Sequence, residues 1–240
     1  MSILNVSGIQ KIYTTRFGGN KVEALKSVSF GVEQGEYVAI MGESGSGKTT
    51  LLNILAALDK PTSGSVVLDG KDLSKIKESQ VAAFRRDNLG FVFQEFNLLD
   101  TFSLEDNIYL PLVLAGKSHK EMQERLKPIA AKLGITELLK KYPYEVSGGQ
   151  KQRAAVARAL ITNPKLILAD EPTGALDYNT GKLILKLLQD TCRKNNMTVV
   201  IVTHNLALCP MADRVIHVKS GQVEKMELNP NPMSIDDIEW

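Results

Sequence analysis

Eight consecutive residues have the types and spacing of a loop that binds phosphate groups. Two glycines, Gly42 and Gly47, are separated by four residues and followed by Lys48 and the hydroxyl residue Thr49. Glycines let the backbone curl so that successive amide hydrogens point inward at phosphate oxygens. We expect Lys48 to reach the β- and γ-phosphates of a nucleotide and the Thr49 hydroxyl to ligate Mg²⁺. A glycine-rich turn that only joins two elements is disfavoured by the apolar run before the loop and the helical pattern after it.

Two adjacent acids form the second candidate group. Asp170 and Glu171 follow the apolar run Leu166–Ala169, so a buried strand would deliver both carboxylates to the edge of a sheet where ligands bind. We expect Asp170 to hold Mg²⁺ through water, and Glu171 to orient or deprotonate the attacking water. The residues alone leave open the alternative that they are a solvated acid pair at a strand end.

Phosphate loops also occur in kinases, GTPases and motors, so they do not decide the class of nucleotide-binding enzyme. A third segment narrows that choice. The sequence resembles the signature of ABC transporter ATPases at Val146-Ser147-Gly148-Gly149-Gln150 and continues as the helix of that family does. Val146 stands where leucine is usual, and both are apolar anchors. A helix N-terminus is a ready anion site, although a cap without ligand has the same residues. The resemblance implies that this segment faces the γ-phosphate held by the opposite subunit, so that two chains sandwich two ATP molecules.

Further landmarks of the family follow in its usual order. The resemblance makes Gln94 the glutamine that senses Mg²⁺ and water, and His204 the switch histidine that contacts the γ-phosphate. It also makes Gly174–Asp177 the D-loop, and Tyr13 the aromatic residue that stacks on adenine. Without the resemblance, Gln94 and His204 would be ordinary polar residues at strand ends, and Tyr13 a half-buried strand residue.

The expected site has three parts. The catalytic residues are Glu171, His204 and Gln94. The metal ligands are Thr49, Gln94 and Asp170. The nucleotide-binding residues are Tyr13, Gly42, Glu43, Ser44, Gly45, Ser46, Gly47, Lys48, Thr49, Thr50, Ser147, Gly148, Gly149, Gln150 and Asp177. The cofactors that the resemblance implies are ATP and Mg²⁺.

Strands and helices must position these residues at one edge of a sheet. Loose apolar alternation over 3–13 and 22–32, around a turn-rich 14–20, predicts an opening β-hairpin. Further strands are predicted at 37–41, 65–68, 89–93, 166–169, 198–202, 215–218 and 223–226. Helices are predicted at 48–58, 79–86, 150–162 and 180–195. Strands that alternate with helices indicate a mostly parallel sheet covered on both faces.

The expected fold class is therefore α/β, with three parts that the resemblance names. They are a P-loop NTPase core with a mostly parallel sheet, an N-terminal antiparallel β subdomain, and an inserted helical subdomain at about 95–160. Together they form one ABC ATPase domain over 1–228. The tail 229–240, rich in Asn, Pro and Asp, is expected to be a loosely attached extension.

The composition limits location and partners. A net charge of +2, with basic and acidic residues interleaved, argues against nucleic acid as a partner. No stretch approaches the roughly 18 uninterrupted apolar residues of a membrane helix, and the N-terminus lacks a secretory pattern. We therefore expect a cytoplasmic protein, and the resemblance implies that it is peripheral, at the cytoplasmic face of the cell membrane. Cys192 and Cys209 have no metal-type spacing and are expected to be reduced, buried thiols.

The resemblance covers residues 2–227 and also suggests a subgroup. The runs 42–48 and 168–177 look most like the macrolide-exporter and lipoprotein-release ATPases. This implies a homodimer under a membrane permease with a large extracytoplasmic domain, and that group can also involve a periplasmic or extracellular adaptor. Glu95, Phe96 and the apolar stretch Ile108–Leu114 would grip a cytoplasmic helix of the permease.

Two alternatives to export remain open at this level. The same ATPase could sense a peptide antibiotic or switch on a cell-wall enzyme, with no solute carried. A soluble ABC ATPase that acts on DNA or ribosomes is disfavoured, because the sequence has neither long coiled coils nor a tandem second ATPase domain.

Overall fold

The chain forms two β-sheets, of which the first is antiparallel. The computed structural model describes residues 2–14, 19–174 and 176–239. The first sheet has the order β2-β1-β4-β5 and contains β1 (Ser2–Thr14), β2 (Lys21–Glu33), β4 (Ser63–Leu68) and β5 (Lys71–Asp72). Strands β1 and β2 confirm the predicted hairpin, and residues 15–18 of its turn lie outside the described residues.

The second sheet is mostly parallel, as predicted. Its order is β10-β9-β3-β8-β7-β6, and only β10 runs antiparallel to its neighbour. Its strands are β3 (Tyr37–Met41), β6 (Leu89–Val92), β7 (Leu166–Asp170), β8 (Thr198–Thr203), β9 (Arg214–Lys219) and β10 (Gln222–Leu228).

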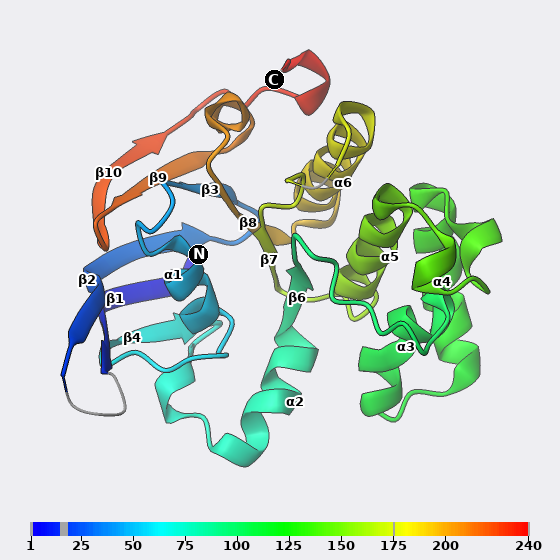
Figure 1. Ribbon diagram of the computed structural model, residues 1–240, viewed down its shortest axis with the longest axis horizontal. Helices are drawn as coiled ribbons and strands as arrows, with labels where there is room; N and C mark the ends of the chain where they lie inside the picture. Colours follow the sequence, from blue (N-terminus) through cyan, green and yellow to red (C-terminus); the bar gives the residue numbers. More distant parts are fainter. Residues whose placement is uncertain (1, 15–18, 175, 240) are drawn as a thin grey trace.

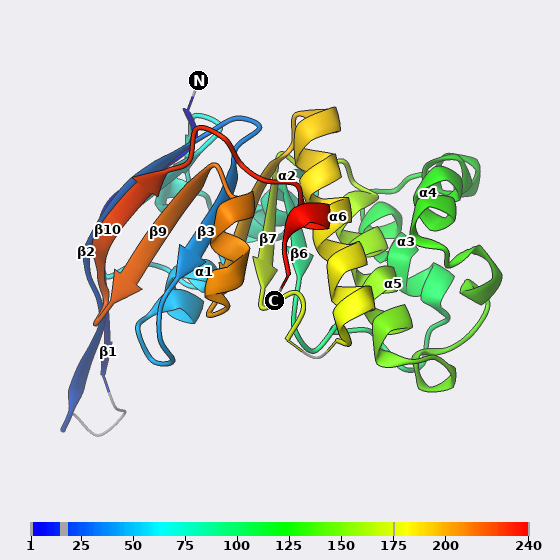
Figure 2. The ribbon, with the colours of Figure 1, turned by 90° about the horizontal axis from the view of Figure 1, so that it is seen from above.

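Alternate residues of the central strands fill two different hydrophobic cores, because successive strand side chains point to opposite faces. Val38 and Ile40 of β3 pack with the antiparallel sheet, α1 (Lys48–Leu55) and α2 (Glu78–Asn88). Tyr37, Ala39 and Met41 pack on the other face, against α3 (Leu104–Leu114), α4 (His119–Leu133), α5 (Gly148–Leu160) and α6 (Tyr178–Asn195). Figures 1 and 2 show this sheet between the two layers. Both of its faces are covered, one of them partly by a second sheet.

Local signals explain where the helices begin and end. In α4, the Ser118 side chain accepts the Glu121 N–H at the start, and Gly134 adopts a left-handed conformation, φ +60°, at the end. Between them, α4 buries Met122, Leu126, Ala130 and Leu133, which recur at helical spacing. Within the described ranges, no helix combines the length and apolar character needed to cross a membrane.

The helix after the phosphate loop is shorter than predicted. We expected it to run to Leu58, but α1 ends at Leu55. Ala57 adopts a left-handed φ of +52°, and the N–H groups of Leu58 and Asp59 both donate to the Asn53 carbonyl. A left-handed residue cannot continue an α-helix, so the chain leaves α1 at this turn.

Both cysteines are free thiols, as predicted. Cys192 is buried on α6, where its Sγ donates to the Gly35 carbonyl at 3.1 Å, and burial raises its pKa to about 12. Cys209 is half-buried, and burial raises the pKa of its thiol as well. Since the thiolate is the reactive form, burial makes both groups less reactive than a free thiol.

The C-terminal tail is docked, which corrects the expectation of a loose extension. Ile235 and Ile238 are buried in the same core as α6, through a short 3₁₀ turn at Ile235–Asp237. Gln189 of α6 accepts the Ile235 N–H at 3.0 Å and donates to the Met233 carbonyl at 2.8 Å. The prediction was wrong because it relied on the Asn, Pro and Asp content of the tail. It did not take account of the two isoleucines, whose burial fixes the segment.

Replacing Ile235 with alanine tests this docking. Ile235 is fully buried, so Ile235→Ala should lower the free energy of unfolding by about 2–3 kcal/mol. Met233, 43% exposed in the same tail, gives the control Met233→Ala, which should cost less than about 1 kcal/mol. Urea denaturation measures both, and equal stability of Ile235→Ala and the parent protein would contradict the docked tail.

Candidate nucleotide site

The phosphate loop links the end of β3 to the start of α1. Gly47 is the residue before the helix and has φ +103°, a left-handed conformation that side chains rarely adopt. A Cβ atom there would lie 2.7 Å from the Ala24 carbonyl oxygen and 2.9 Å from Leu25 Cδ2. Only glycine therefore fits at position 47, because of both the positive φ and the lack of room for a Cβ atom. Ahead of it, the three residues Glu43, Ser44 and Gly45 are exposed.

Lys48 is held inside this loop. Only 8% of the residue is exposed, and its Nζ donates to the carbonyl oxygens of Gly42 at 2.6 Å and Glu43 at 2.7 Å. The Ser46 hydroxyl is buried and has no hydrogen-bond partner in the described structure. A buried unpaired donor beside a tethered ammonium suits a phosphate oxygen, which would satisfy both. The residues therefore fit the nucleotide that the sequence predicts, and Thr49 and Thr50 follow at the start of α1.

Glu171 is held at the end of β7 by two residues from the neighbouring strand end. Its Oε2 accepts the Thr203 hydroxyl at 2.9 Å, and its Oε1 accepts the His204 N–H at 2.9 Å. His204 Nδ1 lies 2.6 Å from the same Oε1. Glu171 adopts φ +42°, a conformation that costs a residue with a side chain about 1–3 kcal/mol. The structure thus brings Glu171 and His204 together in one hydrogen-bonded group.

Asp170 lies between this group and the phosphate loop. Burial, and then the neighbouring charge of Glu171, raise the pKa of Asp170, while Lys48 acts in the opposite direction. A cation at this position would favour the ionised carboxylate. Among the described residues, no cluster of three His, Cys, Asp or Glu side chains could hold a metal alone. Mg²⁺ prefers oxygen ligands, and the Asp170 carboxylate and the Thr49 hydroxyl provide two. Phosphate oxygens would complete its coordination shell.

Gln94 joins the same neighbourhood from the end of β6. A Cβ atom on Gly174 would lie 3.1 Å from Gln94 Nε2 and 3.5 Å from Glu171 Cβ. The glutamine, the D-loop glycine and the catalytic carboxylate predicted from the sequence are therefore neighbours in space. Ala175 of the D-loop lies outside the described residues.

The signature segment caps α5. Ser147 Oγ accepts the Gln150 N–H at 3.3 Å, and Gln150 Oε1 accepts the Ser147 N–H at 2.9 Å. A Cβ on Gly149 would lie 2.7 Å from Thr180 Cγ2 of α6, and one on Gly148 would lie 3.7 Å from Phe96. Asp177 accepts the Thr180 N–H at 3.0 Å and the hydrogen bonds from Thr180 lower its pKa.

This segment is separated from the phosphate loop of its own chain. Helix α5 packs on one face of the six-stranded sheet, and α1 packs on the other. Both views show the two helices apart, with strands of the sheet between them (Figures 1 and 2). The structure therefore groups Lys48, Asp170, Glu171 and His204 at one edge and leaves Ser147–Gln150 outside that group.

Tyr13 lies at the end of β1, beside α1. Its hydroxyl donates to Asp59 Oδ2 at 2.8 Å, and Lys11 Nζ lies 4.9 Å from the ring centroid. Burial, followed by the hydrogen bond to Asp59, raises its pKa, while a hydrogen bond with Thr50 lowers it. The residue is 42% exposed. Stacking on adenine remains a prediction, and Lys11 already occupies one face of the ring.

Two residues that support the site were not predicted from the sequence. Thr203 ends a strand of valines and isoleucines, and its hydroxyl holds Glu171. Gln152 is buried in α5 and its Nε2 donates at 2.9 Å to the carbonyl of Pro172, next to Glu171. For Thr203 the available signal was a polar residue at the end of an apolar run, whereas Gln152 stands between Lys151 and Arg153 and had no such signal.

We expected the stretch Ile108–Leu114 to grip a helix of the permease, but part of it is buried in the protein's own core. Ile108, Tyr109 and Leu112 belong to the core, while Val113 and Leu114 are exposed. Helix α3 packs mainly against α5, which explains the burial. Only the end of the stretch is therefore free to contact a partner.

Comparisons with known proteins identify the family. The family described as ABC transporter matches residues 25–174. The chain belongs to the ABC transporter family. As a member of this family the protein is an ATPase, in agreement with the geometry of the predicted phosphate loop and of Glu171.

Two curated relatives and one solved structure show how similar this ABC ATPase is to known members. It is 48% identical to the bacitracin export ATP-binding protein BceA of Halalkalibacterium halodurans, over 93% of this chain and 87% of that protein. It is 42% identical to the macrolide export ATP-binding/permease protein MacB of a Shewanella species, over 95% of this chain but only 34% of that longer protein. The dimeric post-hydrolysis structure of the ATP-binding cassette MJ0796, bound to ADP and Pi, has a TM-score of 0.87 and 39% identity, and covers 94% of this chain and 98% of that one.

A glycine substitution tests the phosphate loop of this ABC ATPase. Gly47→Ala should lower the free energy of unfolding by about 2–3 kcal/mol and weaken nucleotide binding at least about tenfold, because the new Cβ meets Ala24 and Leu25. Gly45 also has positive φ, at +78°, but a Cβ there meets open space. Gly45→Ala is therefore the control and should cost less stability. Urea denaturation and titration with a fluorescent ATP analogue measure the two effects, and equal losses of stability would contradict the steric account.

Proposed function

We propose that the chain is the ATP-hydrolysing subunit of an ABC exporter and works as a homodimer below a separate membrane permease. One observation carries the homodimer: in one chain, α1 and α5, the helices that follow the phosphate loop and the signature segment, pack on opposite faces of the sheet. A site that uses both is incomplete within one molecule. Two copies arranged head to tail would complete two such sites at once. The dimeric state of the related cassette MJ0796, bound to ADP and Pi, supports this arrangement.

The grouped residues have distinct tasks in hydrolysis. Lys48, freed from the Gly42 and Glu43 carbonyls, would neutralise the β- and γ-phosphates. Glu171 would accept a hydrogen bond from the attacking water and orient it, with Thr203 fixing the carboxylate. Asp170, Thr49 and Gln94 would hold Mg²⁺, which supplies charge neutralisation at the phosphates. His204 would exchange its contact with Glu171 for one with the γ-phosphate.

An export role is favoured by two relatives, whose names specify bacitracin export and macrolide export. The chain would lie at the cytoplasmic face of the membrane under a permease with an extracytoplasmic domain. The exposed apolar side chains that follow Gln94 offer a contact for it: Leu99, Phe102, Val113 and Leu114. Closure of the two ATPase subunits would then move the permease.

Substitution of the catalytic carboxylate tests the dimer. Glu171→Gln should keep ATP binding but reduce turnover at least about a thousandfold, because the amide cannot accept the proton of the attacking water. With bound ATP left uncleaved, the protein should elute as a dimer in size-exclusion chromatography with light scattering. A monomer that retains ATP, or hydrolysis at the parental rate, would contradict this role.

A second substitution separates the two halves of the site. Glu171→Gln combined with Ser147→Arg should bind ATP as a monomer, because Ser147 lies away from the phosphate loop of its own chain. Glu171→Gln combined with Lys48→Ala is the control and should lose ATP binding itself. If Ser147→Arg weakened ATP binding to the monomer as much as Lys48→Ala does, the signature segment would act within one chain.

The permease can be identified with the same trapped form. We would purify tagged Glu171→Gln protein with ATP from native membranes in mild detergent and identify its partners by mass spectrometry. The expected partner has about four membrane spans, roughly eighty apolar residues, and a large outer domain. A partner with more spans and a solute-binding protein would indicate an importer, and recovery without any membrane protein would contradict the permease.

A further inference from the structure

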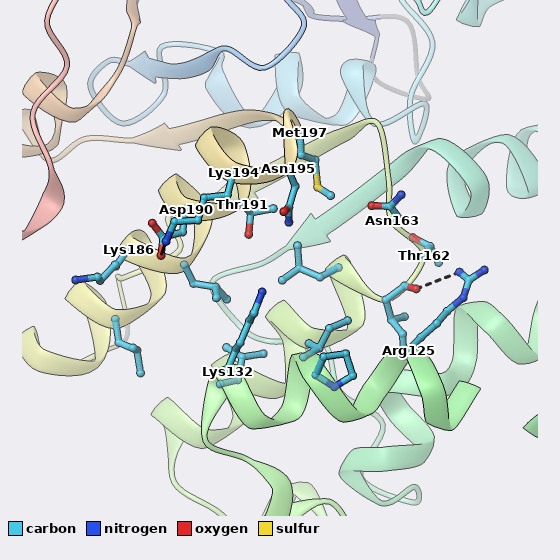
Figure 3. Close-up of a pocket in the computed structure, with 17 residues that line it drawn as sticks. Arg125, Lys132, Thr162, Asn163, Lys186, Asp190, Thr191, Lys194, Asn195 and Met197 are labelled. Carbon is cyan, nitrogen blue, oxygen red and sulfur yellow. Dashed lines mark hydrogen bonds and ion pairs between the residues drawn. The ribbon is translucent and has the colours of Figure 1, made fainter. Parts of the chain in front are cut away.

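A cavity of about 810 Å³ opens between α4 and α6, apart from the nucleotide site. Its walls are α4, the turn 160–163 that follows α5, and α6 (Figure 3). None of the residues that line it belongs to the candidate nucleotide site. Sites for small molecules commonly measure roughly 300–1,000 Å³ and combine apolar walls with a few polar groups. The cavity therefore has the size of a ligand site.

Eight of the 17 residues that line the cavity are apolar. Ile129 and Leu133 come from α4, Leu160 from the end of α5, and Leu187 and Met197 from α6 and the residues after it. Leu183, on the rim, is exposed. Hydrocarbon placed against these side chains would be removed from water, which favours binding in proportion to the apolar area covered.

The charged residues of the cavity are mostly neutralised. Four cations and one acid line it: Arg125, Lys132, Lys186, Lys194 and Asp190. Three of the cations have acidic partners: Arg125 pairs with Glu121 at 2.7 Å, Lys194 with Asp190 at 2.9 Å, and Lys186 with Asp236 of the tail. A single positive charge is therefore left without a partner.

That charge belongs to Lys132. Lys132 is exposed, and across residues 2–14, 19–174 and 176–239 no hydrogen bond or ion pair is found for its ammonium group. Figure 3 shows its side chain rising from α4 towards α6, into the space between the two helices. One unpaired ammonium matches one negative charge, whereas a polyphosphate would require several cations free of acidic partners. The amides of Asn163 and Asn195, also in the lining, can donate further hydrogen bonds.

We propose that this cavity binds a monoanionic amphiphile, namely a free aliphatic carboxylate. Its carboxylate pairs with Lys132, and its hydrocarbon chain lies on the apolar walls between α4 and α6. The site shares no residue with the phosphate loop or the signature segment. It is therefore an additional ligand site on the outer side of the helical layer.

Titration of the full chain with dodecanoate, below the concentration at which it forms micelles, tests the proposal. Isothermal titration calorimetry should show one site, and Lys132→Ala should raise Kd about tenfold, since a charge-assisted contact is lost. Lys132→Arg should keep Kd within about threefold. Lys127 is the matched control, because it is exposed on the same helix but does not line the cavity. Lys127→Ala should leave Kd unchanged.

Changes in the ligand test the apolar walls and the Lys132 contact of the site separately. Octanoate should bind at least about tenfold more weakly than dodecanoate, because four fewer methylene groups are buried. Dodecylammonium should also bind at least about tenfold more weakly, because its charge is repelled by Lys132. Equal Kd values for dodecanoate and dodecylammonium, or for the parent protein and Lys132→Ala, would overturn the proposal.

An anionic membrane surface, like a free aliphatic carboxylate, presents negative charge next to hydrocarbon chains. Sedimentation with phosphatidylglycerol vesicles distinguishes it from the free carboxylate. If dodecanoate does not bind while sedimentation with vesicles depends on Lys132, the cavity is a membrane contact and the proposal is wrong. If dodecanoate binds in a Lys132-dependent way and sedimentation is the same for the parent protein and Lys132→Ala, the free carboxylate is supported.

Discussion

The parallel pairing of β3, β8 and β7 is the constraint on which the site depends. Met41 lies opposite Thr203, and Val202 lies opposite Asp170. Since parallel strands end at the same edge, the loop after β3, the histidine after β8 and the carboxylates of β7 emerge together. A slip of one residue in this register would turn every core side chain of a strand to the wrong face. The two hydrophobic cores therefore fix the catalytic edge as firmly as they fix the sheet.

The catalytic edge itself is held at a cost in stability. Glu171 has a left-handed backbone, Asp170 is partly removed from water beside a second carboxylate, and a buried Ser46 hydroxyl has no partner. Each feature is unfavourable in the isolated chain, although a phosphate oxygen would satisfy the Ser46 hydroxyl and a cation would favour the Asp170 carboxylate. The almost fully buried strands β3, β7 and β8 supply the stability that offsets these local costs.

The sequence predicts the sheet and its catalytic edge well, because both depend on local patterns. Continuous apolar runs such as Tyr37–Met41 are typical of strands buried on both faces, and the glycines of the loop specify its backbone. The tail was predicted wrongly, since the burial of Ile235 depends on Gln189 in a distant helix. The cavity between α4 and α6 was not predicted for the same reason. It depends on how two helices pack, and the pairing of Lys186 with Asp236 is also a long-range contact.

The hydrogen bond from Gln152 to Pro172 has a consequence for communication along the chain. It ties the signature helix directly to the residue after Glu171, inside a layer that excludes water. The other half of this amide, Gln152 Oε1, is buried without a partner, so the contact is only half satisfied. A small rotation of α5 would therefore shift the loop that carries the catalytic carboxylate.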